Sequence, residues 1–389
     1  MRLAILGPSR HPVAEPYAGG QERFTADLSR GLRALGHHVE LYALEGSDPA
    51  VADHLHPMPK LPPLSAIASG DLQLPEPGFL HDQFVYLAAI RDLLCRNDID
   101  AVLNQSLHQL PLALSPAIAA PVITTLHTPP FPWMEVGAWL AGASGHFVAV
   151  SRALQAQWAT LPSSRVVLNG VDPAYFPVGP GGSSVAWVGR MTPEKGADIA
   201  IHAAVEAGVE LRLAGPMSDP EWFHAVISPL LGDSITYLGP LSGSELAQFY
   251  GSSAATLVTP RWEEPFCLVA AESQMCGTPV VGLRRGGLGE VVTGPGGLLV
   301  EPTPDAVTHL AAAVHRVLPA RRGEIGSHAR QHLGIARMVA GYDLMLTDLC
   351  ADAPASRALR SAHLDAGPRD TQRRRVRSPV LEGPQIALA

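Results

Sequence analysis

The sequence of 389 residues is short of several features, and each shortage excludes a class of protein. Charged residues make up only 16% of the chain, and no apolar run approaches the roughly 18 residues that indicate a membrane-spanning helix. The four cysteines form no Cys-x-x-Cys pair, which argues against a disulfide framework and a zinc site. Met1 to Leu6 leads into Gly7 and Pro8 and predicts a strand in place of a signal peptide. We therefore expect a soluble, cytoplasmic protein.

Lysine is almost absent, because only Lys60 and Lys195 among the 28 basic residues are lysines. The net charge of −8 is uneven: residues 353–389 hold seven arginines and three acidic residues, a net of +4, which leaves −12 on the rest. An acidic body argues against a nucleic-acid partner. Residues 353–389 lack apolar periodicity and are predicted to form a disordered basic tail. Weak peripheral contact with an anionic membrane is the alternative.

The order of apolar segments predicts an α/β fold, because short β-branched or apolar runs alternate with amphipathic stretches. The expected strands of residues 1–178 are Leu3–Leu6, Val39–Leu44, Ala101–Leu103, Val122–Leu126, Phe147–Val150 and Val166–Leu168. Those of residues 179–335 are Val185–Val188, Leu211–Ala214, Ile235–Leu238, Ala255–Val258, Pro279–Gly282 and Leu298–Val300. We predict two doubly wound parallel-sheet domains that face one cleft, joined by the Pro- and Gly-rich linker 177–184. A helix over residues 336–352 is expected to pack back towards the first domain.

A Gly-Gly pair precedes the first long helix, which is predicted from Gln21 to Leu35 with Phe24, Leu28, Leu32 and Leu35 on one face. Because glycine lets backbone amides approach an anion closely, Gly19 and Gly20 are candidate ligand-binding residues. A tight turn without a ligand is the alternative. The dinucleotide fingerprint G-x-G-x-x-G is missing here, which argues against a nicotinamide dehydrogenase.

Two cations follow the first strand of the second domain, within Gly189-Arg190-Met191-Thr192-Pro193-Glu194-Lys195-Gly196. The segment leaves a strand and enters a helix, so Arg190 and Lys195 are expected at the edge of the sheet where α/β proteins bind ligands. Both side chains would suit a diphosphate and would stabilise the charge that grows on a departing nucleotide. A solvated pair with Glu194 is the alternative.

Residues 264 to 272 form the most informative stretch, with two glutamates that have seven residues between them. Pro265 lacks an amide hydrogen and suits the first position of a helix, so we predict that a helix begins there with Glu264 at its entrance. The free amides of residues 266–268 would then attract phosphate or sugar oxygens. Glu272 would lie roughly 12 Å along the same helix, so the two carboxylates could hold opposite ends of one nucleotide sugar.

Three weaker signals remain. His127 ends a predicted strand and precedes a Pro-rich aromatic loop, so a site role and a structural role both stay open. Asn169-Gly170-Val171-Asp172 is expected to form a turn, with a site role secondary. Asp98 and Asp100 lie at an ordinary helix-to-strand junction, and no metal role is expected for them.

In combination these motifs resemble glycosyltransferase family 4, the retaining two-domain GT-B enzymes that use nucleotide sugars. The resemblance implies that Arg190 and Lys195 bind the diphosphate, that Glu264 binds the donor sugar, and that Glu272 binds the ribose hydroxyls. It also implies that His127 lines the reacting carbon and that no metal or other cofactor is needed. The implied donor-binding set is Gly19, Gly20, Arg190, Lys195, Leu241, Glu264, Pro265, Phe266, Cys267, Leu268 and Glu272, with His127, Glu264, Arg190 and Lys195 as its catalytic members.

One residue departs from the family pattern, because Cys267 stands where the family usually has glycine. A thiol at a helix start is expected to have a low pKa and to be reactive. The predicted activity is metal-independent transfer of a sugar from a UDP or GDP sugar to an acceptor hydroxyl, with retention. A GT-B UDP-sugar epimerase and a non-catalytic nucleotide-sugar-binding relative are the alternatives. The acceptor is not identified and is expected to be chosen by loops such as His56 to Gln73.

Overall fold

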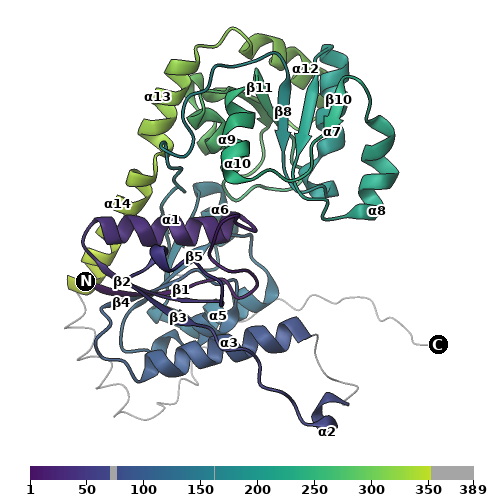
Figure 1. The fold of residues 1–389 in the computed structure, drawn as a ribbon. Coiled ribbons are helices and arrows are strands. Elements are labelled where there is room, and N and C mark those ends of the chain that lie inside the picture. Colours follow the sequence, from purple (N-terminus) through teal and green to yellow (C-terminus); the bar gives the residue numbers. More distant parts are fainter. Residues whose placement is uncertain (71–76, 162, 352–389) are drawn as a thin grey trace, which may run out of the picture. The chain divides into compact units, whose positions relative to one another are not determined.

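Two parallel β-sheets with helices packed against them carry the fold (Figure 1). The structure is a computed structural model, and it describes residues 1–70, 77–161 and 163–351. The first sheet has the order β3-β2-β1-β4-β5-β6-β7 and the second β10-β9-β8-β11-β12-β13, and every pairing between these strands is parallel. The predicted α/β class and the two doubly wound sheets are confirmed. The predicted tail, residues 353–389, lies outside the described residues.

The first sheet contains β1 (Arg2–Leu6), β2 (His38–Ala43), β3 (His54–Pro57), β4 (Ala101–Asn104), β5 (Val122–Leu126), β6 (His146–Ala149) and β7 (Arg165–Val166). The helices of this half are α1 (Gly20–Ala34), α2 (Ala66–Ser69), α3 (Pro77–Leu94), α4 (Gln109–Ala113), α5 (Pro132–Ala141) and α6 (Arg152–Gln157). Sequence patterns missed β3, because the segment His-Leu-His-Pro has no β-branched residue and lies at the edge of the sheet.

The second sheet contains β8 (Val185–Val188), β9 (Leu211–Ala214), β10 (Ile235–Tyr237), β11 (Ala255–Val258), β12 (Val280–Leu283) and β13 (Gly297–Val300). Its helices are α7 (Ala197–Ala207), α8 (Pro220–Trp222), α9 (Gly243–Gly251), α10 (Leu268–Met275), α11 (Leu288–Val291), α12 (Ala306–Val317) and α13 (Arg322–Leu333). The last described helix is α14 (Ile335–Ala351).

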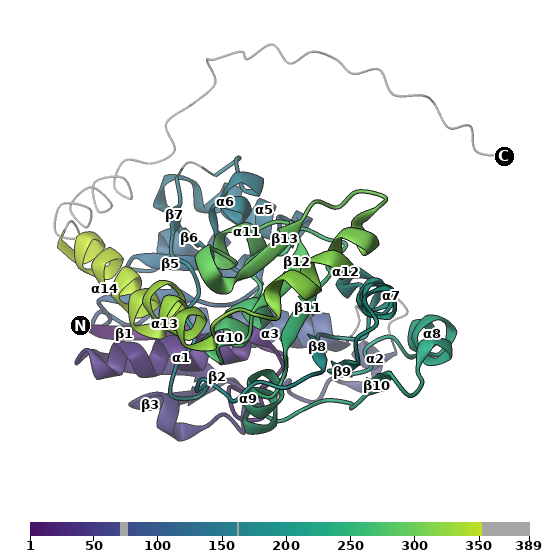
Figure 2. The ribbon, with the colours of Figure 1, turned by 90° about the horizontal axis from the view of Figure 1, so that it is seen from above.

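Helix α1 packs its apolar face onto the first sheet, and α14 completes the same core. Phe24, Leu28 and Leu32 are buried against β1 and β2, and full burial of one such leucine stabilises the fold by about 1.5–3 kcal/mol. Leu35 was expected on this face but is 54% exposed, because α1 ends at Ala34 and Leu35 caps it. Figures 1 and 2 show α14 beside α1, and Gly31 leaves no room for a side chain against Val339 of α14.

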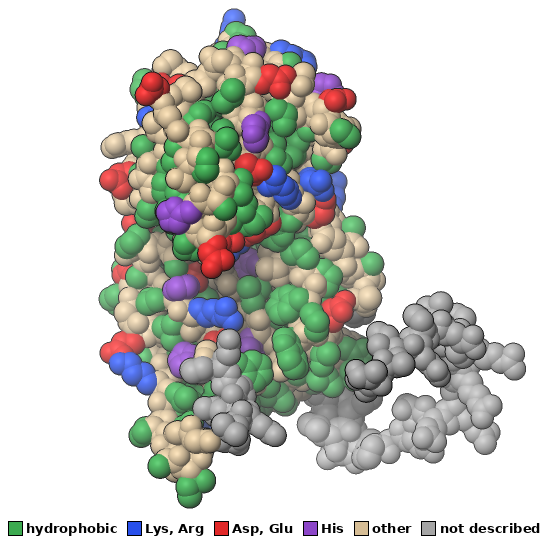
Figure 3. Space-filling model, turned by 90° about the vertical axis from the view of Figure 1, so that its right-hand side faces the viewer, with side chains coloured by type: hydrophobic (Ala, Val, Ile, Leu, Met, Phe, Trp, Pro, Cys, Tyr) green, Lys and Arg blue, Asp and Glu red, His purple; other side chains and the backbone are tan. Residues whose placement is uncertain are grey.

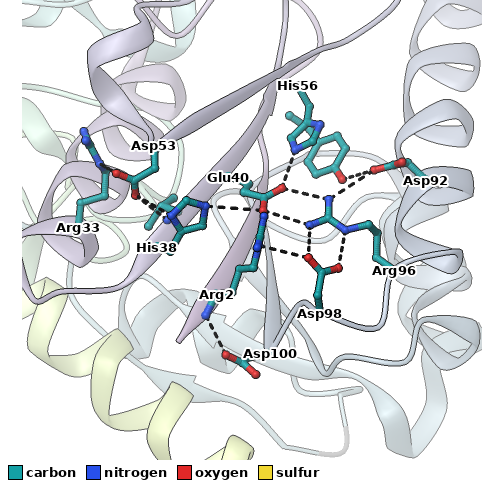
Figure 4. A network of polar contacts seen from close by, with 12 residues as sticks. Arg2, Arg33, His38, Glu40, Asp53, His56, Asp92, Arg96, Asp98 and Asp100 are labelled. Carbon is teal, nitrogen blue, oxygen red and sulfur yellow. Dashed lines mark hydrogen bonds and ion pairs between the residues drawn. The ribbon is translucent and has the colours of Figure 1, made fainter.

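A buried carboxylate ties β1, β2 and the end of α3 together (Figure 4). Glu40 of β2 is 1% exposed and contacts Arg2 (Nε to Oε1, 2.5 Å), His56 (Nε2 to Oε2, 2.6 Å) and Arg96 (3.1 Å to each oxygen). Burial opposes ionisation, but these hydrogen bonds outweigh it and lower the pKa of Glu40 to about 2. Asp98 binds the same Arg96 (Nε to Oδ1, 2.6 Å), so it serves this network.

The two halves meet through the segments that join them. Val171 pairs with the residues on either side of Gly334: its N–H donates to Leu333 O (2.8 Å), and Ile335 N donates back to Val171 O (3.1 Å). Val171 and Phe176 also share one buried apolar cluster with Phe266 and Cys267. Met1–Cys350 therefore forms one compact unit. Within the described residues, no helix combines the length and the apolar character needed to cross a bilayer.

Candidate active site

Lys195 and Glu264 form an ion pair at the carboxyl edge of the second sheet. A short 3-10 turn over Pro193–Lys195 follows β8, and Gly196 (φ +68°) redirects the chain into α7, a left-handed conformation that suits glycine. Lys195 Nζ donates to Glu264 Oε1 (2.6 Å), and Trp262 Nε1 donates to the same oxygen (2.8 Å). The ammonium also lies 4.7 Å from the centroid of the Trp262 ring, a cation–π distance. The predicted strand, turn and helix around Lys195 are all present.

The helix that carries Glu272 begins later than predicted. Helix α10 starts at Leu268, so Pro265 and Phe266 lie in the preceding loop and Cys267 is the N-cap. The loop is held from outside, because Ser151 Oγ donates to Pro265 O (2.6 Å) and Gly287 N donates to Glu264 O (2.7 Å). The prediction that Glu264 and Glu272 lie on one helix was therefore wrong. The amides of the first turn belong to residues 268–270, not to residues 266–268.

Cys267 has the backbone conformation of a glycine. It is the one non-glycine residue with positive φ among those described, at φ +84° and ψ 77°. An L-residue in this region is strained by its Cβ, which explains physically why glycine suits the position. The expectation of a reactive thiol is contradicted, because burial, and then the charge of Glu264, raises the pKa of Cys267 well above its usual range. The thiol stays protonated and acts as a small apolar group.

Glu272 lies on α10 and faces α1 of the other half. Tyr250 donates a hydrogen bond from its hydroxyl to Glu272 Oε2 (3.2 Å). From α1, the charge of Arg23 lowers the pKa of Glu272 and the charge of Asp27 raises it. Burial raises the pKa of Glu272 to about 7. A small cavity brings the two halves together here, lined by Arg23, Phe24, Asp27, Gly170, Val171, Phe176, Leu268 and Glu272.

The start of α1 lies against the start of α10. Gly19 is the N-cap of α1 and Gly20 its first residue. A Cβ on Gly20 would lie 2.9 Å from Leu268 Cδ1, closer than real Cβ contacts, so glycine permits this approach. Gly19 is extended (φ −163°), a conformation open to any residue. The amino ends of two helices, one from each half, therefore converge, which favours a negatively charged ligand there.

His127 follows β5 and contacts Phe24 of α1. Its ring meets Phe24 edge-on, with centroids 4.8 Å apart, and Phe24 also lines the cavity with Glu272. His127 Nε2 lies 2.9 Å from Oε1 of Gln105, the residue that follows β4. With this oxygen as acceptor, His127 carries its proton on Nε2. Burial lowers the pKa of His127 to about 4, so the ring is neutral at pH 7.

Two predicted site residues lie apart from these contacts. Arg190 is 56% exposed on its side chain and pairs with Glu194 (3.1 Å), which is the alternative that the sequence left open. Leu241 packs beside Phe249 in a small apolar cluster under β8 and β9. The other predicted residues gather around the beginnings of α1, α7 and α10. A hollow between the two halves is visible in Figure 3, bordered by acidic side chains.

Sequence patterns missed three residues of this site. Trp262 contacts both members of the Lys195 and Glu264 pair, and its place two residues before Glu264 was the available signal. The guanidinium of Arg23 lies 4.3 Å from the centroid of the Tyr175 ring, and its charge lowers the pKa of Glu272. Its place shortly after Gly19-Gly20 was the sequence feature that could have identified it. Gln105 follows a strand that was predicted, but no motif marked it.

Comparison with known families identifies the class of protein. Residues 18–175 match the family model described as Glycosyltransferase Family 4, and residues 182–319 match Glycosyl transferases group 1. The fold is that of a GT-B glycosyltransferase. The chain belongs to glycosyltransferase family 4, which confirms the predicted family and the enzyme class.

Relatives and solved structures fit the same assignment. A D-inositol 3-phosphate glycosyltransferase of Acidothermus cellulolyticus is 36% identical over 43% of this chain and 43% of its own length. One of Pseudarthrobacter chlorophenolicus is 28% identical over 77% of this chain and 83% of its own length. The structure of AviGT4, a glycosyltransferase involved in avilamycin A biosynthesis, superposes with a TM-score of 0.67 at 25% identity, covering 90% of this chain and 98% of that one. The Anabaena protein Alr3699/HepE in complex with UDP-glucose has a TM-score of 0.68 at 19% identity over 90% and 100%.

Proposed function

We propose that this glycosyltransferase moves a sugar from a nucleoside diphosphate sugar of the UDP or GDP type to an acceptor hydroxyl, with retention and without a metal ion. The observation that carries the proposal is the pair of Lys195 and Glu264 beside the start of α10. A buried carboxylate can accept hydrogen bonds from sugar hydroxyls, and the ammonium can stabilise the charge on the departing diphosphate.

Each half supplies one part of the proposed donor site. The C-terminal half offers Lys195, Glu264 and the amides at the start of α10, and Arg190 can turn from Glu194 at small cost because both are exposed. Glu272 accepts from the ribose hydroxyls in its ionised form. The N-terminal half offers the amides at the start of α1 and a neutral His127, which can hydrogen-bond a sugar hydroxyl but carries no charge. The two cations provide the positive charge that a metal supplies elsewhere.

In the proposed reaction with retention, the donor itself takes up the proton of the acceptor hydroxyl. The acceptor oxygen bonds to the anomeric carbon on the face from which the diphosphate leaves, the bond from that carbon to the diphosphate breaks, and the acceptor proton passes to a departing phosphate oxygen. The protein then has to position both reactants and stabilise the leaving group, which is the work proposed for Lys195 and Glu264.

A ligand screen tests the donor assignment. Thermal unfolding is measured with UDP, GDP, ADP and dTDP sugars, with UDP-glucose included because Alr3699/HepE was solved with it. A donor at 100 times its Kd stabilises by about 2.7 kcal/mol, a readily measured shift. Lys195→Met should lose the shift. Arg165→Met, which removes a cation from an exposed pair with Asp348 (2.7 Å), should keep it.

The anomeric configuration of the product, read by NMR, tests retention, and activity in EDTA tests metal independence. An inverted product or a requirement for a divalent cation would contradict those parts of the proposal. Formation of an epimer from the donor alone would favour the epimerase alternative. A cytoplasmic location also belongs to the proposal. None of the four cysteines, all within the described residues, forms a disulfide. Recovery of the protein outside the cytoplasmic fraction would contradict the proposed location.

A further inference from the structure

A cavity opens at the carboxyl ends of β1, β2 and β3. Its volume is about 970 Å³, at the upper end of the range for small-molecule sites. The lining residues come from the loops after these three strands and from the first turns of α3, and they include Ser9, Arg10, Phe79 and Asp82. His127 and Gln105 follow β5 and β4 at the same carboxyl edge of the sheet. The donor site described above does not use this cavity.

The buried polar residues of the cavity lining are Asp82 and Ser9. The side chain of Asp82 is 12% exposed, and Ser9 Oγ donates to its Oδ1 (2.6 Å). Its second oxygen has a long contact with Arg10 (3.7 Å), whose side chain is 80% exposed. Oδ2 therefore keeps acceptor capacity for a ligand. Carboxylates accept hydrogen bonds from neighbouring hydroxyls, so the cavity suits the hydroxyl-bearing part of a sugar or polyol.

One edge of the cavity is aromatic and continues onto an exposed apolar helix face. Phe79 lines the cavity and lies 6.2 Å from the ring of Trp133 at the start of α5. Trp133 is 55% and Trp139 80% exposed, and Val136 and Leu140 lie with them on the outer face of α5. The opposite face of α5 packs on α4, where Gly137 leaves no room for a side chain against Gln109. Figure 3 shows hydrophobic side chains gathered on the lower half of the molecule. Contiguous exposed apolar surface of this kind marks a binding site.

We propose that the acceptor is an amphiphilic glycoside or polyol, with its hydroxyl-bearing head beside Asp82 and its apolar part on Phe79 and Trp133. The proposal rests on the proposed glycosyltransferase function and adds the class of the acceptor. The continuity of the cavity with the two rings favours one molecule that spans both. The charge of α5 argues against an anionic bilayer as the occupant, because this fully described helix carries Glu135 and no lysine or arginine.

The experiment compares matched glycosides with short and long apolar parts. Methyl and octyl β-D-glucoside, galactoside and mannoside are titrated by calorimetry without donor, and KM values are then measured with the donor identified by thermal shift. Octyl glycosides should bind at least about tenfold tighter than their methyl partners, because several methylene groups leave water. Phe79→Ser and Trp133→Ser should reduce the ratio of the methyl-glycoside Kd to the octyl-glycoside Kd at least about fivefold and leave the donor KM unchanged. Leu344→Ser, which removes a 62% exposed apolar side chain from α14, should leave the ratio intact.

Asp82→Asn tests the position of the hydroxyl-bearing head, because it should weaken the binding of methyl and octyl glycosides by the same factor. Equal affinity of methyl and octyl partners, or a ratio that survives Phe79→Ser, would overturn the proposal. Binding to phosphatidylcholine vesicles that Trp139→Ser abolishes, without any octyl preference, would assign the surface to a membrane and would also overturn it. Failure of every nucleotide sugar to stabilise the protein would instead contradict the proposed function, since the calorimetric titrations need no donor.

Discussion

Lys195 Nζ lies 2.6 Å from Glu264 Oε1, so two residues with separate predicted roles neutralise each other. The carboxylate of Glu264 is 9% exposed on its side chain and the lysine 22%, so the pair is largely removed from water. A charge in such a place is costly without its partner. The pair therefore holds the loop before α10 in place, and it presents an ammonium and a carboxylate to a ligand in one fixed geometry.

Replacing Lys195 by methionine keeps the length of the side chain and removes its charge. We expect kcat/KM to fall about 10²–10³-fold, the size of effect found when one donor to a developing charge is removed. The free energy of unfolding should fall by about 1–3 kcal/mol, because Glu264 loses its cation. Adding Glu264→Gln should recover stability and leave activity low. Steady-state kinetics and urea unfolding measure both effects, and a near-normal kcat/KM in Lys195→Met would sink the assignment.

At position 267 the glycine variant should be more stable than the alanine variant, which is the reverse of the usual order. At φ +84° the Cβ of alanine is strained, so Cys267→Gly should be more stable than Cys267→Ala by about 1 kcal/mol. Cys276 is a matched control, because it is buried with φ −73°, and there alanine should exceed glycine by about 0.5–1 kcal/mol. Cys267→Gly should also retain transfer activity. Urea unfolding of the four variants decides the order, and the same order at both positions would refute the argument.

Glu272 should make stability fall as pH rises. Its pKa is raised from 4.5 to about 7 in the folded state, so between these values the folded chain holds a proton that the unfolded chain has released. The free energy of unfolding should decline across this window by up to about 1.4 kcal/mol per pH unit, and Glu272→Gln should flatten the decline. Glu206→Gln, at an exposed position on α7, should not. Nucleotide binding should strengthen above pH 7, where the ionised carboxylate can accept from ribose. Equal slopes in wild type and Glu272→Gln would contradict this.

Glu40 should make stability rise with pH, the opposite of the effect of Glu272. Its pKa falls from 4.5 to about 2 on folding, so it stabilises the protein above pH 4.5, and this contribution is lost as the pH falls towards 2. Glu40→Gln should cost about 3 kcal/mol at pH 7, because Arg2 and Arg96 lose their buried partner. The difference from wild type should shrink near pH 2.5. Activity at 25 °C should stay unchanged, and a loss of activity without a loss of stability would show that the network does more than support the sheet.

Gln105 should control the protonation of His127. In Gln105→Glu a carboxylate faces His127 Nε2, and we expect the pKa of His127 to rise by about 1–3 units from its present value of about 4. The variant should then lose activity towards acid pH, where the ring becomes charged. Gln105→Ala should leave the pKa low and the pH profile flat. NMR titration of His127 and pH–rate profiles test this, and an unshifted titration in Gln105→Glu would rule the role out.

Much of the fold could be predicted because it depends on local patterns. Apolar runs at Val122–Leu126 and Val185–Val188 coincide with β5 and β8, since a buried parallel strand needs apolar residues on both faces. The edge strand His54–Pro57 could not be predicted, because its pairing with β2 supplies the order that its own residues do not favour. Among site residues, Lys195 could be placed because a strand, a turn and a helix in sequence define where it lies.

The start of α10 shows why the rest could not be predicted. Pro265 favours a helical start by itself, but bonds from Ser151 and Gly287, 114 positions before and 22 positions after it in the sequence, hold the loop in another form. The partners of His127 and Glu272, namely Gln105 and Arg23, likewise come from other strands and helices.

The sequence by itself determined the α/β class, the two sheets, the family and the residues that carry charge at the site. It did so because periodicity and motif spacing are local properties. The tertiary structure alone decided that Lys195 pairs with Glu264, that Cys267 takes a left-handed conformation, and that Glu272 titrates near neutral pH. Each of these depends on burial and on contacts between residues far apart in the chain, which no local pattern contains.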